Sequence, residues 1–315
     1  MPSNQTHQCP LCRNDEVELY AEAKDVEYAT TSDTYSFYNC RACDILFVSP
    51  MLDDQLDLIY PSNYYAFGGA QETLAQKIKN YLDLRLFRKI TDHFPQNTAL
   101  NILDVGGGDG WLLDLFKQMD RKFGETWVVD LDQKAQEKAI AKGHNFHLGP
   151  IEMFTYDGKF DVILMLNLIE HVKDPRAVLL QIKSLLSGNG CVLIKTPNFN
   201  SLDAKLFKNN NWGGFHTPRH FVLFTQSSFE SLAQEVGLKV TQSQLTQGAP
   251  FWAVSVTALA QKYGLIKVDY SKGMHRHWLY KVSTLLGAAF DILRGPFSDT
   301  SQMFITLSHS DDSKN

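Results

Sequence analysis

The segment spanning residues 101–110, Asn-Ile-Leu-Asp-Val-Gly-Gly-Gly-Asp-Gly, combines an acidic residue with glycines in a pattern suited to ligand binding. Asp104 is followed by alternating glycines, which allow positive φ angles or direct contact between backbone and ligand. The dinucleotide motif G-x-G-x-x-G is not matched, because Trp111 occupies the place of its third glycine, and no Gly-Lys-Ser/Thr of a P-loop follows. A carboxylate here suits a cationic ligand better than a phosphate. The candidate ligand-binding residues are Asp104, Gly106, Gly108 and Gly110.

Three histidines are candidates for a general base. His171 follows an apolar run, and His216 and His220 lie in the segment Trp-Gly-Gly-Phe-His-Thr-Pro-Arg-His that ends at residue 220. Imidazole accepts protons near neutral pH, which suits removal of a proton from a hydroxyl. The alternative for each histidine is a hydrogen-bonded structural role. Arg219, between the last two, could pair with an anionic acceptor such as a phosphate or carboxylate.

Two Cys-x-x-Cys pairs near the N-terminus have the spacing of metal ligands. They are Cys9 with Cys12 and Cys40 with Cys43, four of the five cysteines in the chain. Four thiolates suit tetrahedral zinc, and a site closed by four protein ligands is structural. We therefore predict a zinc-ribbon-like module. The alternatives are a disulfide-linked module and a ribbon that has lost its metal.

Apolar runs alternating with helical patterns predict a doubly wound, Rossmann-like α/β fold with a seven-stranded, mostly parallel sheet, preceded by the zinc-ribbon-like module. The expected strands are 101–105, 126–129, 145–148, 160–166, 191–196, 238–246 and 303–308. Ligands of such sheets bind beyond the carboxyl ends of the strands. Asp130 ends the second strand, where an acidic residue bonds the ribose hydroxyls of an adenosine.

Helix signals lie between these strands. Asp132 is expected to cap a helix over 133–142, and Asp174 to cap one that starts at Pro175 and ends near 187–190. Ser227 and Glu230 have the spacing of a capping box.

The predicted organisation is a zinc-ribbon-like module at 1–50, a linker and amphipathic helix at 51–98, a catalytic core at 99–248, and C-terminal helices with the last strand at 249–315. Tyr60, Tyr64 and Tyr65 of the linker either cover an active site or pack between modules. Apolar residues repeat at helical spacing from 278 to 293, near several basic residues. This segment is a lid, a basic amphipathic helix giving peripheral membrane contact through 276–294, or a helix packed on the sheet or on another subunit.

The pattern Asp-x-Gly-x-Gly-x-Gly resembles motif I of the class I S-adenosylmethionine-dependent methyltransferases. The segment 160–175 resembles the family's signature around strand four, and the later segment 196–198 also resembles the family. The histidine segment resembles an H-x-P-R-H element of a branch acting on small molecules, including ubiquinone-type O-methyltransferases. The resemblance implies S-adenosylmethionine as cofactor. Its binding residues would be Asp104, Gly106, Gly108, Gly110, Asp130 and Asn167.

We therefore expect methyl transfer to a small-molecule acceptor, as O-methylation of a saccharide, quinone or lipid-linked intermediate. The alternatives are C- or N-methylation of a sugar or other metabolite, and a zinc-ribbon partner-binding protein on an inactive methyltransferase scaffold. A net charge of −5 argues against nucleic acid as the acceptor. The first residues lack an apolar signal region, and no window approaches the roughly 20 apolar residues of a transmembrane helix. We expect a cytoplasmic protein.

Overall fold

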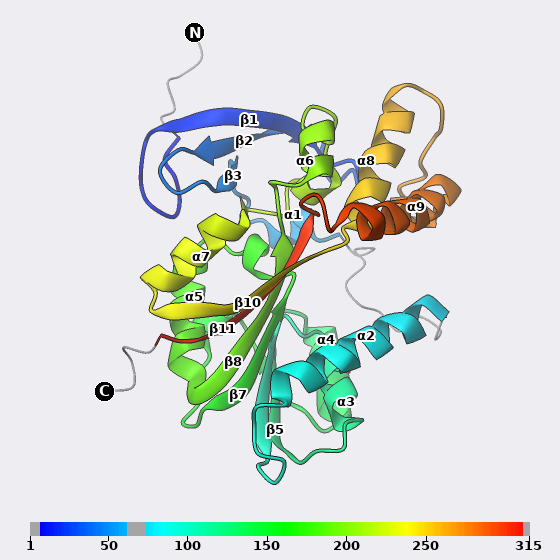
Figure 1. The fold of residues 1–315 in the computed structure, drawn as a ribbon. Helices are drawn as coiled ribbons and strands as arrows, with labels where there is room; N and C mark the ends of the chain where they lie inside the picture. Colours follow the sequence, from blue (N-terminus) through cyan, green and yellow to red (C-terminus); the bar gives the residue numbers. More distant parts are fainter. Residues whose placement is uncertain (1–6, 62–73, 311–315) are drawn as a thin grey trace.

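A seven-stranded sheet forms the centre of the computed structural model, which describes residues 7–61 and 74–310 (Figure 1). The strand order is β10-β11-β8-β7-β4-β5-β6. Strands β8, β7, β4, β5 and β6 run parallel, and β11 is antiparallel to both β8 and β10. The bounds are β4 Leu100–Val105, β5 Phe123–Asp130, β6 Asn145–Leu148, β7 Phe160–Leu166, β8 Leu186–Pro197, β10 Leu238–Thr246 and β11 Gln302–His309. The predicted fold class is confirmed.

Helices cover both faces of this sheet (Figure 1). The helices are α2 Leu74–Thr91, α3 Trp111–Lys117 and α4 Gln133–Ala141 on one side, with α5 Pro175–Leu185 and α7 Gln226–Glu235 on the other. Alternate residues of β4 point to opposite faces, as the strand period of two requires. Ile102 therefore joins the core cluster that contains Phe116 of α3, while Leu103 joins the one that contains Ile182 of α5.

Two of the predicted helix caps are confirmed, and a third was placed wrongly. The Asp132 carboxylate accepts from the Lys134 amide, and the Asp174 carboxylate accepts from the Ala177 amide. The capping box of α7 is formed instead by Thr225 and Ser228, because the helix begins at Gln226.

The end of α5 was also predicted too late. The helix stops at Leu185, and the strand begins at once because Leu186 pairs with Phe160 of β7.

A second, antiparallel sheet joins the N-terminal segment to the histidine-bearing segment. Its order is β1-β2-β3-β9, with bounds β1 Val17–Lys24, β2 Thr34–Cys40, β3 Leu46–Ser49 and β9 Val222–Leu223. Strand β9 begins two residues after His220, and its Val222 pairs with Phe47 of β3. Phe37 also stacks on Phe215, with ring centroids 4.4 Å apart. The division of the chain at residue 50 stays a prediction from the sequence.

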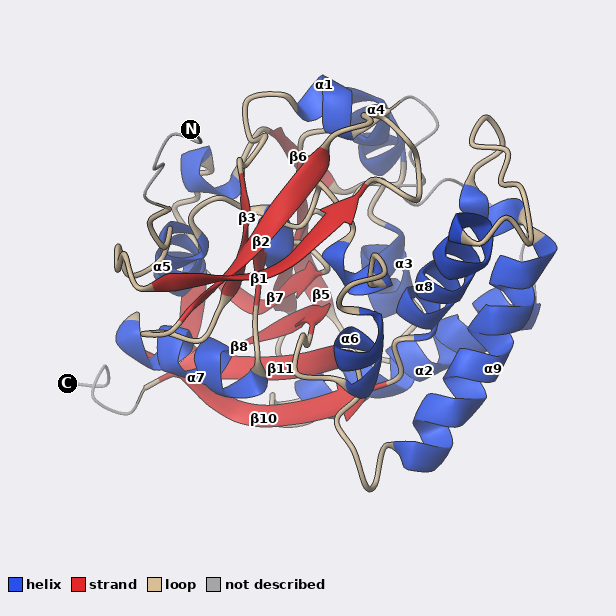
Figure 2. Ribbon diagram, turned by 90° about the horizontal axis from the view of Figure 1, so that it is seen from above, coloured by secondary structure: helices blue, strands red, loops and turns tan. Residues whose placement is uncertain are grey.

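Two further helices, α8 Ala249–Lys262 and α9 Trp278–Arg294, lie side by side on one flank of the molecule (Figure 2). They contact each other closely at Gly287, where an added Cβ would lie 2.8 Å from Trp252 Cβ. Two short helices are α1 Leu56–Ile59 and α6 Leu202–Phe207. Tyr64 and Tyr65 of the predicted linker lie outside the described residues. Across 7–61 and 74–310, no helix is both long and apolar enough to cross a membrane.

Candidate active site and metal centre

The glycine-rich turn links β4 to α3 through left-handed backbone conformations. Gly106, Gly108 and Gly110 have φ angles of +73°, +53° and +75°, which L-residues with side chains rarely adopt. A Cβ on Gly110 would lie 2.8 Å from His144 Cδ2, whereas no atom of residues 7–61 and 74–310, apart from the two chain neighbours, lies within 4 Å of a Cβ placed on Gly108. A ligand can therefore approach the backbone directly at Gly108.

Asp104 lies under this turn with a carboxylate that is poorly compensated. The residue is 1% exposed, and its Oδ2 has no hydrogen-bond partner among the described residues. Burial, reinforced by the nearby charge of Asp130, raises the pKa of the Asp104 carboxyl well above its usual range. A cationic group bound beside it would favour the ionised form. The site therefore fits a positively charged ligand.

The carboxyl ends of β5 and β7 complete the surroundings of the turn. The Asp130 carboxylate accepts a hydrogen bond of 2.8 Å from the Gly108 amide and one of 2.9 Å from the Asp132 amide. Asn167, which follows β7, has a φ angle of +56°, and its amide donates to the carbonyl of Lys195. Strands β4, β5 and β7 are parallel neighbours, so these predicted residues share one edge of the sheet.

Support for the turn also comes from residues that the sequence did not single out. The two ring nitrogens of His144 lie 2.9 Å from Thr126 Oγ1 and 3.0 Å from Asp114 Oδ1. Lys142 Nζ lies 2.9 Å from the carboxylate of Asp109. These residues come from the flanking elements β5, α3 and the end of α4, and their spacing forms no motif.

The three predicted histidines form a cluster. The ring centroids of His171 and His220 are 4.6 Å apart, those of His216 and His220 are 4.9 Å apart, and those of His171 and His216 are 6.0 Å apart. His171 follows β7, while the other two precede β9. The fold thus brings together residues separated by about 45 positions in the sequence.

Two of these histidines are held neutral. Burial, followed by the charge of His216, lowers the pKa of His171 to about 3. Burial lowers the pKa of His220 well below its usual value, because a charged ring would be desolvated and would repel any proton taken up by the adjacent His171. The Nδ1–H of His220 donates to the Gly214 carbonyl at 2.8 Å, and His171 Nδ1 lies 3.0 Å from the Tyr60 hydroxyl. Both rings suit hydrogen bonding at neutral pH.

His216 has a different partner. Its Nδ1 lies 2.6 Å from Glu27 Oε1, in a contact between residues 189 positions apart. A carboxylate at this position stabilises the imidazolium that forms when the ring accepts a proton. The φ angle of His216 is +39°, and such sparsely populated backbone conformations cluster at functional sites. No sequence motif points to Glu27, which lies in the loop between β1 and β2.

Glu170 links the histidines to the sheet. Its Oε2 accepts from the Thr196 hydroxyl at 2.9 Å, and its Oε1 lies 3.9 Å from His220 Nε2. Its backbone carbonyl accepts from the amide of Phe221, the residue before β9. Burial raises the pKa of the Glu170 carboxyl to about 7. This carboxyl can therefore hold or release a proton next to His220 near neutral pH.

Arg219, from the sequence a possible partner of an anionic acceptor, is fully buried in an ion pair with Asp25. Its Nη2 donates to Asp25 Oδ2 at 3.0 Å, and its Nη1 donates to the Thr217 carbonyl at 2.9 Å. Burial opposes ionisation of Asp25, but the hydrogen bond and charge of Arg219 outweigh it and lower the pKa of the Asp25 carboxyl. The pair fixes the histidine segment against the loop after β1.

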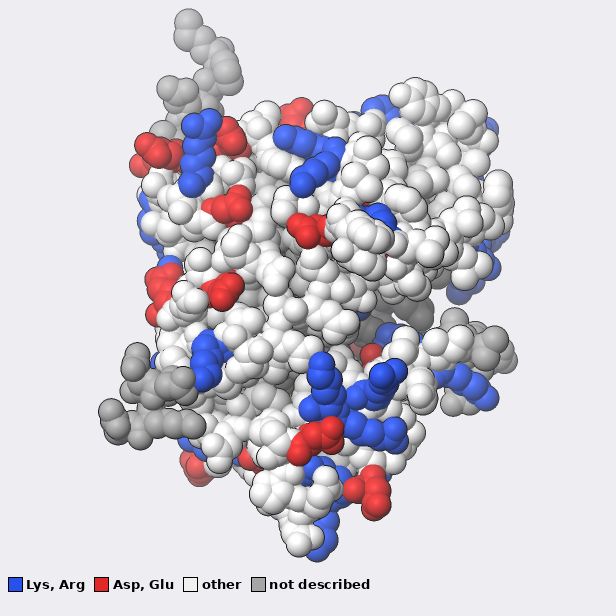
Figure 3. Space-filling model, viewed as in Figure 1, with Lys and Arg blue, Asp and Glu red and all other residues white. Residues whose placement is uncertain are grey.

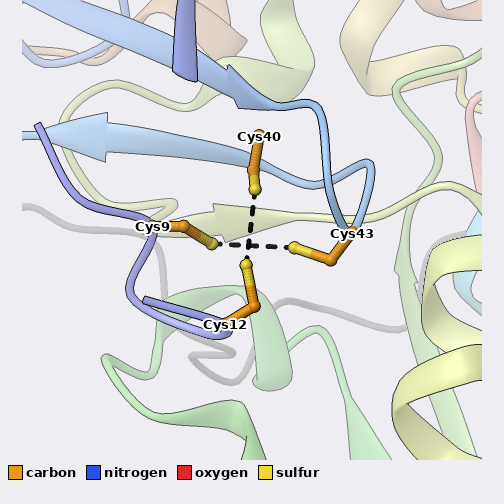
Figure 4. A group of neighbouring side chains, drawn as sticks. All are labelled: Cys9, Cys12, Cys40 and Cys43. Carbon is orange, nitrogen blue, oxygen red and sulfur yellow. Dashed lines mark hydrogen bonds between the residues drawn. The ribbon is translucent and has the colours of Figure 1, made fainter. Parts of the chain in front are cut away.

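The four predicted zinc ligands converge on one point (Figure 4). The Sγ atoms of Cys9 and Cys43 are 3.6 Å apart, those of Cys12 and Cys40 are 3.5 Å apart, and all four lie within 4.8 Å of one another. Tetrahedral zinc with Zn–S bonds of about 2.3 Å places its sulfur ligands about 3.8 Å apart. The four thiols therefore fit a zinc ion.

The two Cys-x-x-Cys turns have the same backbone geometry. In each turn, the amide four residues after the first cysteine donates to that cysteine's carbonyl, from Arg13 to Cys9 and from Asp44 to Cys40. Arg13 and Asp44 also share positive φ angles, of +62° and +50°. Two equivalent turns facing each other are expected of a zinc ribbon built from paired knuckles.

Comparison with known proteins identifies the larger part of the chain. A family profile described as a methyltransferase domain matches residues 78–243. The ubiquinone biosynthesis O-methyltransferase of Rhodopseudomonas palustris (strain HaA2) is 29% identical over 111 residues, covering 33% of this chain and 42% of that protein. Its counterpart in Rickettsia felis (strain ATCC VR-1525 / URRWXCal2) is 29% identical over 118 residues, covering 36% and 48%. The matches thus span less than half the length of these relatives.

A solved structure has the same overall fold. The crystal structure of coclaurine N-methyltransferase bound to N-methylheliamine and SAH superposes with a TM-score of 0.50 at 13% identity, covering 80% of each chain.

Proposed function

Because the chain belongs to this family of methyltransferase domains, we propose that it transfers a methyl group from S-adenosylmethionine to a hydroxyl group of a small-molecule acceptor. The observation that carries the proposal is the buried Asp104 carboxylate, one oxygen of which has no partner among the described residues, beneath a glycine turn that the same part of the chain leaves open at Gly108. The cationic sulfonium and ammonium groups of S-adenosylmethionine would supply the positive counter-charge that stabilises this carboxylate.

Six residues would hold the cofactor at the carboxyl edge of the sheet: Asp104, Gly106, Gly108, Gly110, Asp130 and Asn167. The chemistry supplied by S-adenosylmethionine is a methyl group activated on a sulfonium. The protein has to bind the acceptor, align its nucleophilic atom and remove its proton.

His216 is the proposed proton acceptor. The Glu27 carboxylate at 2.6 Å stabilises its protonated form, whereas burial makes His171 and His220 weak bases. These two neutral rings would orient the acceptor by hydrogen bonding. The acceptor class that the relatives' names support is a quinone-type phenol, and a saccharide or lipid-linked intermediate shares the same hydroxyl chemistry. C- or N-methylation is the alternative.

The test is transfer of labelled methyl groups from S-adenosylmethionine into an extract of cells that lack this protein, followed by separation into lipid, small-molecule, RNA and protein fractions. We expect label in the lipid or small-molecule fraction. His216→Ala should lower kcat by about 10²- to 10⁴-fold while leaving cofactor affinity unchanged, and His93→Ala, on the opposite side of the fold, is the matched control. Cofactor binding without any label transfer would favour an inactive scaffold that binds a partner through its ribbon.

We also propose that Cys9, Cys12, Cys40 and Cys43 bind one structural zinc ion. The ion would fix the start of β1 and the turn between β2 and β3, and thereby the sheet that β9 completes. Purified protein should contain one zinc per chain by elemental analysis. Cys12→Ser should lower this content and destabilise the N-terminal sheet, whereas Cys191→Ser, in the sheet core, should keep the metal. Full zinc content in Cys12→Ser would contradict the assignment.

A further inference from the structure

Helix α9 has small and polar residues toward the protein and apolar residues toward solvent. Ser283, Gly287 and Asp291 are buried at one-turn spacing. The Asp291 carboxylate accepts from the Gly248 amide at 2.7 Å and from Trp252 Nε1 at 3.0 Å. Surface helices of globular proteins have the opposite arrangement. Polar contacts with α8 and its N-terminus therefore hold α9 with its apolar side outward.

The outward side is a continuous apolar surface, here called the α9 apolar face. At about 100° per residue, its side chains cover roughly 140° of the helix circumference. Leu285 and Leu293 are 72% and 75% exposed. The face consists of Trp278, Val282, Leu285, Leu286, Phe290 and Leu293. An exposed surface of this kind on a folded chain indicates an interaction site.

The charges around this face are mostly positive. Between residues 263 and 297 the exposed charged residues are four cations, Lys267, Lys272, Arg276 and Lys281, and one acid, Asp269. The chain as a whole has a net charge of −5, so the charge of this segment is opposite in sign to that of the whole chain. Figure 3 shows a broad uncharged area over α8 and α9 with Lys and Arg at its edges.

We propose that the α9 apolar face docks on an anionic lipid bilayer, with the helix lying along the membrane interface. Apolar side chains would enter the boundary between headgroups and acyl chains, while Lys281 and Arg276 contact anionic headgroups. The charge pattern favours lipid over a second copy of the chain, because a symmetric pair would bring the same cationic edge together from both sides. The inference does not depend on the identity of the methyl acceptor.

The experiment is co-sedimentation of the full chain with vesicles of phosphatidylcholine alone, or of phosphatidylcholine containing about one third phosphatidylglycerol. We expect binding to the anionic vesicles that weakens as salt is added. Leu285→Glu with Leu286→Glu should lower the partition coefficient at least tenfold. Lys281→Glu with Arg276→Glu should lower it by about fivefold or more per cation. Ile140→Glu with Leu180→Glu changes exposed apolar residues of α4 and α5 and should have no effect.

Two outcomes would overturn the proposal: absence of vesicle binding by the unaltered chain, and equal binding to neutral and anionic vesicles. If vesicle binding is absent, a dimer in sedimentation velocity that Leu285→Glu with Leu286→Glu converts to monomer would assign the α9 apolar face to a second copy of the chain. Circular dichroism would establish that each variant remains folded.

Discussion

The glycine turn and the histidine cluster lie at the same edge of the sheet, but they are built in different ways. The turn comes from one contiguous segment, 101–110, and the residues that support it belong to β5, α3 and the loop after α4. The cluster comes from two segments of the core, and its charged partners Asp25 and Glu27 lie 194 and 189 positions from Arg219 and His216.

This difference suits the two parts of the site to separate proposed roles, with the glycine turn binding the cofactor and the histidine cluster facing the acceptor. A turn made by local backbone conformation can bind the same cofactor in many proteins. A histidine segment held by the loop after β1 and by the β3–β9 pairing depends on the N-terminal sheet for its position. We therefore expect changes in the N-terminal segment to affect the acceptor side of the site and to leave cofactor binding intact.

The largest expected effect is a loss of stability in Asp25→Asn, which tests whether the N-terminal segment holds the histidine cluster in place. The substitution leaves the Arg219 guanidinium buried without its counter-charge, which should cost about 3–5 kcal/mol of unfolding free energy at pH 7. The lowered pKa of Asp25 means that its ion pair contributes above the unfolded-state pKa near 4 and is lost as the pH falls through the folded-state value. The difference between variant and wild type should therefore shrink in acid.

Urea unfolding at several pH values measures this effect, with the exposed residue Asp33, in the same loop, changed to Asn as control. Cofactor affinity of the folded Asp25→Asn protein should stay close to wild type. A loss of less than about 1 kcal/mol would show that the distant pair does not hold the histidine segment.

The same contrast explains what the sequence predicted and what it did not. The seven strands, the glycine turn, the Asp132 and Asp174 caps and the convergence of the cysteines depend on local patterns, and the structure contains all of them. From the sequence, Arg219 is a possible partner for an anionic acceptor, because a sequence does not reveal which distant carboxylate neutralises a cation. Asp25 and Glu27 belong to no motif, so only the fold brings them to the histidines.

A second prediction concerns Glu170, which belongs to the histidine cluster. Its folded-state pKa of about 7 lies above the ordinary value of 4.5, so the folded chain binds more protons than the unfolded chain between these pH values. Stability should consequently fall as the pH rises from about 4.5 to about 7, by about 3 kcal/mol in total. Glu170→Gln keeps an acceptor for Thr196 and removes the charge, so this slope should disappear.

Thermal or urea unfolding between pH 4 and pH 8 measures the slope, and Glu230→Gln on the exposed side of α7 is the control. A variant that retains the wild-type slope would assign the pH dependence to another group. A variant less stable than wild type at pH 8 would mean that the ionised carboxylate has a favourable partner in the folded chain.

The smallest of these effects is expected for Asp104→Asn, which tests the glycine turn at residues 101–110. The carboxyl is buried and its pKa is raised, so a neutral amide of the same shape should not lower the stability of the ligand-free chain. It removes the negative charge that a bound cation requires, which should weaken S-adenosylmethionine binding by about 10- to 100-fold. Calorimetric titration gives the affinity, with Asp109→Asn as control, because Asp109 lies in the same turn and pairs with Lys142. Unchanged affinity in Asp104→Asn would show that the charge of Asp104 does not contribute to cofactor binding. Weakened binding at full stability would show that the glycine turn binds the cofactor independently of the histidine cluster.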